Sequence, residues 1–157
     1  MKNNILIPLI ISLLVIFFLS CEKKDEKKAV ILEDFEQEIV DLINHYRDTA
    51  GLNELAVDTI IRREARKHSI NIATEKVPFG HDGYQERANI IFSEVGGTHF
   101  GENVAGGNYP IAEYFIESWL NSPDHKANID DDYNYTGVGV AETEDGYKYC
   151  TQIFLKK

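Results

Sequence analysis

Three polar side chains that lie far apart in the sequence are of types that could share one chemical site. Glu102 lies in the glycine-rich run 101–107, where small residues allow close backbone approach and leave the carboxylate facing open space. His81 follows a glycine and precedes an Asp-Gly turn dipeptide, which places it on a loop. His125 lies in the polar run 119–129. If the fold brings them together, two imidazoles and one carboxylate line a single cleft.

Such a set has more than one chemical interpretation. Two neutral imidazoles and a carboxylate suit zinc or a similar divalent cation at about 2.0 to 2.2 Å, with one position left for water. A bound metal would lower the pKa of that water toward about 7, which would supply a nucleophile. The chain has no His-Glu-x-x-His helix and no Gly-x-Ser-x-Gly elbow. The same three side chains could instead form a hydrogen-bonded knot between loops or a simple binding cleft.

Two amphipathic helices are predicted before the first of these residues. Helical spacing of apolar side chains predicts one helix over residues 33–50 and a second that follows the N-cap Asp58 and ends near Glu75. His68 falls on the inner face of the second helix, where we expect a core imidazole bonded to backbone, with a position in the cleft as the alternative. Arg47 lies on the polar edge of the first helix and is expected to be solvated.

The rest of the chain predicts shorter elements. A short helix over 85–92 precedes a strand or extended loop over 99–105, and Pro110 is expected at the first position of the next helix. A single turn after residue 122 would present His125. A terminal hairpin pairs 136–142 with 147–155, and its second strand alternates between two faces. One face carries Tyr147, Tyr149, Thr151 and Ile153, and the other Lys148, Cys150, Gln152 and Phe154. Helices with a late antiparallel hairpin indicate an α+β layered domain.

The N-terminus has the features of a lipoprotein signal peptide. Residues 1–20 begin with a positive charge and contain an apolar run of about 15 residues, which is short against the roughly 20 that a spanning helix needs. The run ends at Leu19-Ser20-Cys21, which predicts cleavage before Cys21 and acylation of its thiol. A retained N-terminal anchor helix is the alternative. Either arrangement places the protein at the cell membrane or outer membrane, facing away from the cytoplasm.

The charged stretch after Cys21 predicts a flexible tether over 21–32, followed by one domain over 33–157. Removing residues 1–20 removes one lysine and no acid, which changes the formal charge from −10 to −11. This balance argues against nucleic acid and against electrostatic docking on anionic lipid. After acylation of Cys21 only Cys150 remains, so no intramolecular disulfide is available, and Cys150 is expected to be a small buried residue.

Six segments in this order together resemble the bacterial branch of the CAP superfamily, also called SCP domains. That superfamily comprises cysteine-rich secretory proteins, antigen 5 and pathogenesis-related 1 proteins. The resemblance covers roughly residues 33–156. Any one motif is weak, whereas six in sequence are specific. The segments are 65–69 (Ala-Arg-Lys-His-Ser), 79–81 (Phe-Gly-His), 101–105 (Gly-Glu-Asn-Val-Ala), 119–129, 137–140 (Gly-Val-Gly-Val) and 149–154 (Tyr-Cys-Thr-Gln-Ile-Phe).

The resemblance implies a three-layer α-β-α sandwich with a central antiparallel sheet. It also implies a cleft that in many members is lined by two histidines and two acids and can hold a divalent cation. The first family histidine is matched by His81 and the first family acid by Glu102. The second acid falls at residue 121 or 122, which are Asn and Ser here, and the second histidine falls at Tyr149. Both of those positions therefore depart from the family pattern.

His125 is the residue that could fill the space left by these departures, with Tyr149 or Gln152 beside it. The possible ligands of a cation such as zinc are then His81, His125 and Glu102.

The resemblance favours a membrane-tethered, extracytoplasmic domain that binds a cation, a small molecule, a lipid or an envelope component in this cleft. No catalytic activity is general to the family, and members elsewhere are associated with lipid or sterol binding and with extracellular signalling. A conventional enzyme is therefore not the first expectation. One alternative is a metal-dependent hydrolase of cell-envelope peptides or polysaccharide, with Glu102, His81 and His125 as its catalytic groups. A second alternative is a surface lipoprotein that adheres to other molecules through its acidic face.

Overall fold

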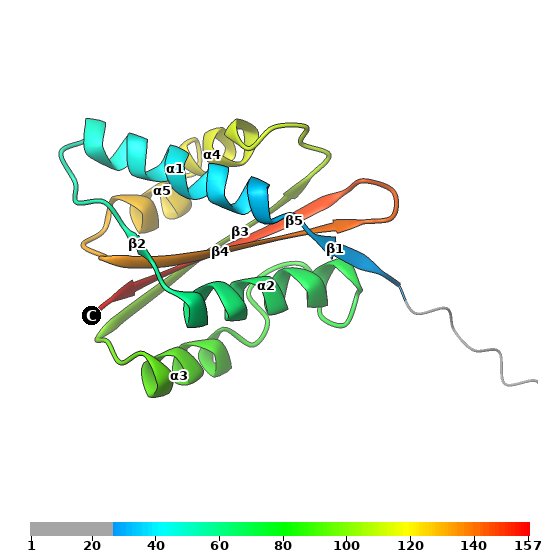
Figure 1. Cartoon of the computed structure of the whole chain (residues 1–157), viewed down its shortest axis with the longest axis horizontal. Coiled ribbons are helices and arrows are strands. Elements are labelled where there is room, and N and C mark those ends of the chain that lie inside the picture. The colour runs from blue at the N-terminus through cyan, green and yellow to red at the C-terminus, as the bar shows by residue number, and fades with distance from the viewer. Residues whose placement is uncertain (1–26) are drawn as a thin grey trace, which may run out of the picture.

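In the computed structural model, which describes residues 27–157, one β-sheet lies between two layers of helices (Figure 1). The predicted α+β fold with three layers and antiparallel hairpin pairing is confirmed. The residues predicted to form the signal peptide, Cys21 and the first part of the predicted tether lie outside the described residues. Within residues 27–157, no helix is both long and apolar enough to cross a bilayer.

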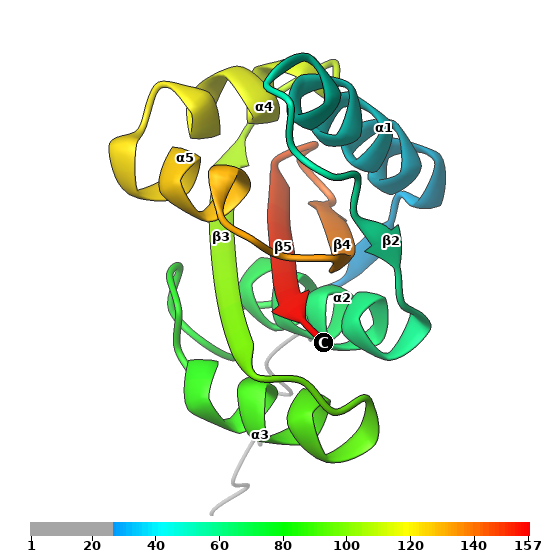
Figure 2. The same ribbon diagram turned by 90° about the vertical axis from the view of Figure 1, so that its left-hand side faces the viewer.

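The helices divide between the two faces of the sheet (Figures 1 and 2). One layer holds α1 (Glu33–Thr49), α4 (Glu113–Leu120) and α5 (Pro123–Asp130), and the other holds α2 (Thr59–Ala73) and α3 (Tyr84–Glu94). The N-terminus of α2 is fixed as expected, because the Asp58 carboxylate accepts hydrogen bonds from the backbone N–H groups of Ile60 and Ile61 at 2.8 and 3.1 Å.

The sheet has the strand order β1-β4-β5-β3, and the short strand β2 also pairs with β4. Strand β3 therefore lies at one edge and pairs only with β5, whereas β4 carries β1 antiparallel and β2 parallel along its other side. The strands are β1 (Ala29–Ile31), β2 (Ala56–Val57), β3 (His99–Gly107), β4 (Tyr135–Thr143) and β5 (Lys148–Lys156).

The predicted alternation of β5 divides the core into two clusters. Cys150 and Phe154 pack toward α1, α4 and α5 in a cluster that includes Trp119, whereas Ile153 and Leu155 pack toward α2 and α3. All five of these side chains are fully buried. Full burial of a large apolar side chain contributes about 1.5 to 3 kcal/mol, so the two clusters hold the layers together without any disulfide bond between described residues.

Helix α2 packs against β4 more closely than side chains would allow. A Cβ built on Gly139 would lie 2.2 Å from the backbone nitrogen of Arg66, and one built on Gly137 would lie 2.2 Å from that of Arg62. Glycine at these two positions lets the helix backbone rest directly on the strand. The position of α2 on the sheet is therefore fixed by backbone contact as well as by the core.

Several boundaries differ from the expectations. Helix α4 begins at Glu113, so Pro110 lies in a bend before it, and the single turn predicted after residue 122 is a two-turn helix with Pro123 at its start. The strands β1 and β2 were not predicted. Because residues 29–31 pair with β4, the folded part begins within the range assigned to the tether. These two strands are short and lack enough residues for a visible alternation.

The expectation of a solvated Arg47 was wrong. Its side chain is 1 % exposed and donates to the carbonyl oxygens of four residues that follow α1 or α5 or lie at the end of α5. A buried guanidinium with this many acceptors ties the ends of α1 and α5 together by satisfying backbone carbonyls there. The acceptors are Asn53, Ile129, Asp131 and Tyr133.

Candidate functional site

The candidate site lies at the exposed-edge strand of the sheet, where Glu102 projects from the middle of β3. Residues on this strand alternate between the two helical layers, so Glu102 faces α2 and α3 while Asn103 faces α5. The loop before α3 carries His81 to the same edge. Groups from both layers thus reach one strand.

The Glu102 carboxylate is buried and has cationic and imidazole partners. Its side chain is 0 % exposed, and Arg87 of α3 donates from Nε to Oε2 at 2.8 Å and from Nη2 to Oε1 at 2.7 Å. The Nδ1 atom of His81 lies 2.9 Å from Oε1. A carboxylate only accepts hydrogen bonds, so Nδ1 carries the proton, and in the neutral ring Nε2 keeps its lone pair. The His81 side chain is 50 % exposed, which leaves that nitrogen accessible to a ligand.

Arg87 is the functional residue that the sequence reasoning missed. Besides the two contacts to Glu102, its Nη1 donates to the backbone oxygen of Asp82 at 2.6 Å, so one guanidinium holds both the carboxylate and the loop. Arg87 lies on the buried face of α3 with Ala88 and Ile91. An arginine on the apolar stripe of a helix requires a buried acceptor, and this was the signal that could have identified it.

His68 supports the loop that carries His81. The ring is 2 % exposed, and its Nε2 lies 2.8 Å from the backbone oxygen of Gly80, the residue before His81. Burial lowers the pKa of His68, and the hydrogen bond to Gly80 opposes this only in part, so the ring is neutral and Nε2–H donates. The expectation of a core histidine bonded to backbone is confirmed. It positions the loop that presents His81.

His125 reaches the site from the opposite layer. Its backbone oxygen accepts a hydrogen bond from Asn103 Nδ2 at 3.0 Å, and Asn128 Nδ2 donates to Asn103 Oδ1 at 2.8 Å, which docks α5 on β3. Burial lowers the pKa of His125, and the nearby His81 lowers it further. Within residues 27–157 no hydrogen bond joins the His125 ring to His81 or to Glu102.

The other two predicted cleft residues lie elsewhere. Tyr149 pairs in register with Gly106, four residues along β3 from Glu102, which corresponds to roughly 13 Å. It faces the same helical layer as Glu102 but lines a separate pocket. The expectation that Gln152 lines the cleft was wrong, because its side chain is fully buried on the opposite face of the sheet and donates to Thr136 Oγ1 at 3.2 Å. Both residues were assigned to the cleft from a family motif, and the second histidine of that motif is replaced by Tyr149 in this chain.

The arrangement does not fit a divalent cation. Arg87 occupies the side of Glu102 that a metal ion would need, and both carboxylate oxygens already accept hydrogen bonds from it. In the described part of the chain, no group of three or more His, Cys, Asp or Glu side chains is arranged to hold a metal ion. The metal set of His81, His125 and Glu102 therefore lacks a free carboxylate. The positive charge that balances Glu102 comes from the protein itself.

Comparison with known sequences gives a family for this fold and site. The family model described as the cysteine-rich secretory protein family, CAP, matches residues 40–154. An uncharacterized protein of Bacillus subtilis, YkwD, is 30% identical over 126 residues, which cover 78% of this chain and 48% of that protein. The chain thus spans about half the length of the curated relative.

Solved structures with the same fold come from several bacteria. An extracellular SCP-domain protein of Bacillus anthracis matches with a TM-score of 0.68 at 28% identity, covering 80% of this chain and 41% of that one. An outer surface protein of Borrelia burgdorferi matches with a TM-score of 0.71 at 20% identity, covering 83% and 98% of the two chains. A cysteine-rich secretory protein of Staphylococcus aureus gives a TM-score of 0.64 at 22% identity, covering 80% and 39%. The last two show similarity of fold alone.

Proposed function

Because the chain belongs to the cysteine-rich secretory protein family, we propose that it is a membrane-tethered, extracytoplasmic member that binds a polar ligand at His81, on the β3 edge, without a metal ion. The observation that carries the proposal is the 2.9 Å contact between His81 Nδ1 and Glu102 Oε1. It fixes the tautomer and leaves Nε2 of a half-exposed ring as an acceptor. His125 lies on α5, in the layer on the other face of the sheet, and its backbone oxygen accepts a hydrogen bond from Asn103 of β3.

The chemistry of the cleft favours a ligand that donates hydrogen bonds. With Nδ1–H donated to Glu102, His81 Nε2 is available as an acceptor, and burial lowers the pKa of His125, which favours its neutral form. The only buried cation at the site, Arg87, is already paired with Glu102. Hydroxyl groups of an envelope glycan or amide groups of an envelope peptide suit these acceptors.

Binding is tested by titrating the protein with soluble glycan and peptide fragments of a bacterial envelope and following backbone amide shifts. We expect shifts at His81, Glu102 and His125 that disappear in a His81→Gln variant. The matched control is His45→Gln, which changes an exposed histidine on α1 far from β3. Retained binding in His81→Gln, or equal loss in both variants, would contradict the proposal.

The membrane tether is supported by the sequence Leu19-Ser20-Cys21 and by the extracellular location named for the structural relative from Bacillus anthracis. Metabolic labelling with palmitate tests it. We expect label on the wild-type chain and none on Cys21→Ser, with the labelled chain in the membrane fraction. Equal labelling of both chains would refute acylation at Cys21.

A second candidate function has one specific observation in its favour. A carboxylate that orients an imidazole through Nδ1 is the arrangement that general-base catalysis requires, with water as the nucleophile. A hydrolase of envelope peptides or polysaccharide would then act through His81 rather than through a metal ion. Hydrolysis of an envelope extract that persists in the presence of a chelator and vanishes in His81→Gln would favour this candidate over simple binding.

A further inference from the structure

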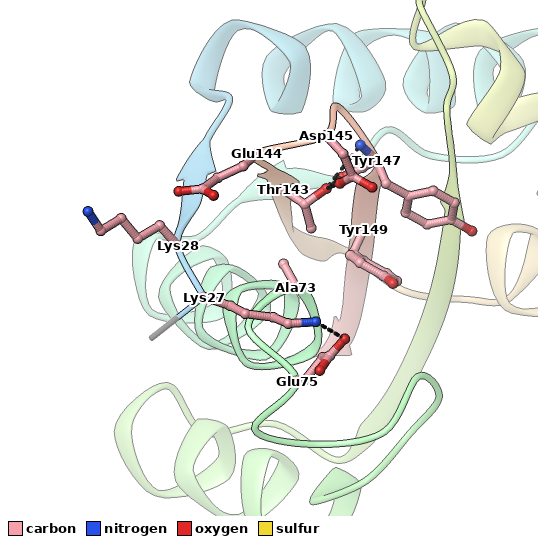
Figure 3. Close-up of a pocket in the computed structure, with 9 residues that line it drawn as sticks. All are labelled: Lys27, Lys28, Ala73, Glu75, Thr143, Glu144, Asp145, Tyr147 and Tyr149. Atoms are coloured by element: carbon pink, nitrogen blue, oxygen red, sulfur yellow. Dashed lines mark hydrogen bonds and ion pairs between the residues drawn. The ribbon is translucent and has the colours of Figure 1, made fainter. Parts of the chain in front are cut away.

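A second cavity of about 400 Å³ lies at the turn that joins β4 to β5, beside the C-terminus of α2 (Figure 3). It is separate from the cleft of His81 and Glu102, since neither residue lines it. The residues that surround it are Lys27, Lys28, Ala73, Glu75, Thr143, Glu144, Asp145, Tyr147 and Tyr149.

One wall of this cavity is aromatic. The ring centroids of Tyr147 and Tyr149 lie 4.9 Å apart, and Phe79 lies 6.0 Å from Tyr149. A Cβ on Gly106 would meet all three rings at 3.1 to 3.3 Å, so this glycine allows the rings to lie against β3. Phe79 is 59% exposed. Ring faces in such a setting attract organic cations.

The rim carries charges of both signs. Glu75, Glu144 and Asp145 contribute three carboxylates, and Lys27 and Lys28 two ammonium groups; in Figure 3 the Lys28 side chain extends away from the tyrosine rings. Lys27 extends across the cavity beneath Tyr149 and pairs with Glu75, as the dashed line in Figure 3 shows. A side chain of the protein thus already places an ammonium group beside a tyrosine ring and a carboxylate.

We propose that this cavity binds the zwitterionic head group of a membrane phospholipid. The ammonium group of the lipid would lie against Tyr149 and the carboxylates of Glu75 and Asp145, in the place that Lys27 now fills. The phosphate would pair with Lys27, once displaced from Glu75, and with Lys28. A ligand with both charges matches this rim, whereas a purely anionic lipid meets three carboxylates and a negative domain.

The membrane is the source of this ligand because the cavity is lined by residues close in sequence to Cys21. Lys27 is six residues after Cys21, a distance that an extended chain spans in roughly 20 Å. An acylated Cys21 would hold the cavity near the lipid surface. This argument rests on the proposed tether, so the experiment uses a chain that cannot be acylated.

The test uses residues 21–157 carrying Cys21→Ser, which include both core clusters, and glycerophosphocholine as the soluble probe. We expect amide shifts at Thr143, Tyr147 and Tyr149, and affinity at least about tenfold weaker for choline or inorganic phosphate alone, because linked charges act together. The same chain should sediment with phosphatidylcholine vesicles and not with phosphatidylglycerol vesicles.

Two double variants sharpen the test. Lys27→Gln with Lys28→Gln, and Glu75→Gln with Asp145→Asn, should each weaken binding by about fivefold or more, since each removes charged contacts to one end of the probe. Lys76→Gln and Glu117→Gln change exposed charges outside the cavity and should leave the affinity unchanged.

Absence of shifts at saturating probe, tighter binding after loss of both lysines, or stronger sedimentation with the anionic vesicles would overturn the proposal. Head-group binding without palmitate labelling in the cell would refute the tether and leave the cavity site standing. Labelling without head-group binding would refute the cavity site alone.

Discussion

The two edges of the sheet each hold a buried glutamate paired with an arginine, but the third hydrogen-bond partner of the glutamate differs between them. At the β4 edge, Arg66 of α2 donates to Glu36 of α1, and the third partner of Glu36 is the backbone N–H of Val140 at 3.1 Å. At the β3 edge, the third partner of Glu102 is the half-exposed ring of His81.

The difference separates an ion pair that serves only the fold from one that belongs to the proposed site. Glu36 closes the gap along β4 between β1 and β2, and all of its acceptor capacity goes to the fold. Glu102 uses the same type of pairing to orient a group that reaches solvent. A buried Glu–Arg pair is thus by itself no evidence of a functional site. The evidence is a third partner of the glutamate that reaches the surface.

The largest effect is expected from Arg87→Met, which leaves the fully buried Glu102 without a counter-ion. The free energy of unfolding should fall by about 3 to 5 kcal/mol in a urea titration. Replacing both partners, as Arg87→Met with Glu102→Leu, should restore much of this loss, because no unpaired charge remains. The matched control is Lys156→Met in the solvent-exposed pair with Asp132, expected to cost less than about 1 kcal/mol. A similar loss in the Lys156 and Arg87 variants would refute the role assigned to burial.

A smaller effect is expected from Glu36→Gln at the other edge. Burial raises the pKa of Glu36, so the ionised carboxylate is held at a cost that glutamine removes, and Arg66 is 26% exposed and can be hydrated. We expect a loss of about 2 kcal/mol in the same urea titration. The signals of the His81 ring should not change. A shift of those signals would show that the two edges are coupled and would weaken the comparison.

The third effect in size is expected in the pH dependence of the free energy of unfolding, which His68 and His125 should determine. Their pKa values are lowered in the folded protein, so the unfolded chain binds protons more tightly. The stabilisation is present above the unfolded value near 6.5 and is lost as the pH falls toward the folded pKa values. Between about pH 7.5 and 5.5 we expect a loss on the order of 1 kcal/mol. His68→Gln should reduce this slope, and an unchanged slope would contradict the cause given for the shift.

The smallest effect is expected from His81→Asn. This half-exposed ring contributes one contact to a carboxylate that stays paired with Arg87, so the free energy of unfolding should change by less than about 1 kcal/mol. Nitrogen NMR of the wild-type ring should show a protonated Nδ1 and an unprotonated Nε2. The opposite tautomer would contradict the acceptor role on which the cleft proposal rests.

Much of the fold could be predicted because the long elements carry strong periodic patterns. The helices α1 and α2, the N-cap Asp58 and the two faces of β5 follow directly from the sequence. The strands β1 and β2 could not, since two or three residues show no period and their pairing depends on distant parts of β4.

Prediction of the site was limited by charge rather than by pattern. His81 and Glu102 were recognised by type and by resemblance to a family, and the structure joins them. Arg87 was overlooked because we looked for metal ligands around Glu102. An arginine is not a metal ligand, although its guanidinium can neutralise the carboxylate in place of a metal ion. Gln152 was wrongly assigned to the cleft because a motif gives only the position of a residue in the sequence. The face of the sheet to which its side chain points follows from strand alternation.

The direct seating of α2 on Gly137 and Gly139 has a consequence for motion. Separating this helix from β4 would expose two backbones at once, so α2 and the hairpin should exchange their amide hydrogens together and slowly. Helix α3 has no such contact and is held at the site through Arg87. Local opening should therefore begin at α3. If such opening admits a ligand to His81, the other layers of the sandwich should stay closed.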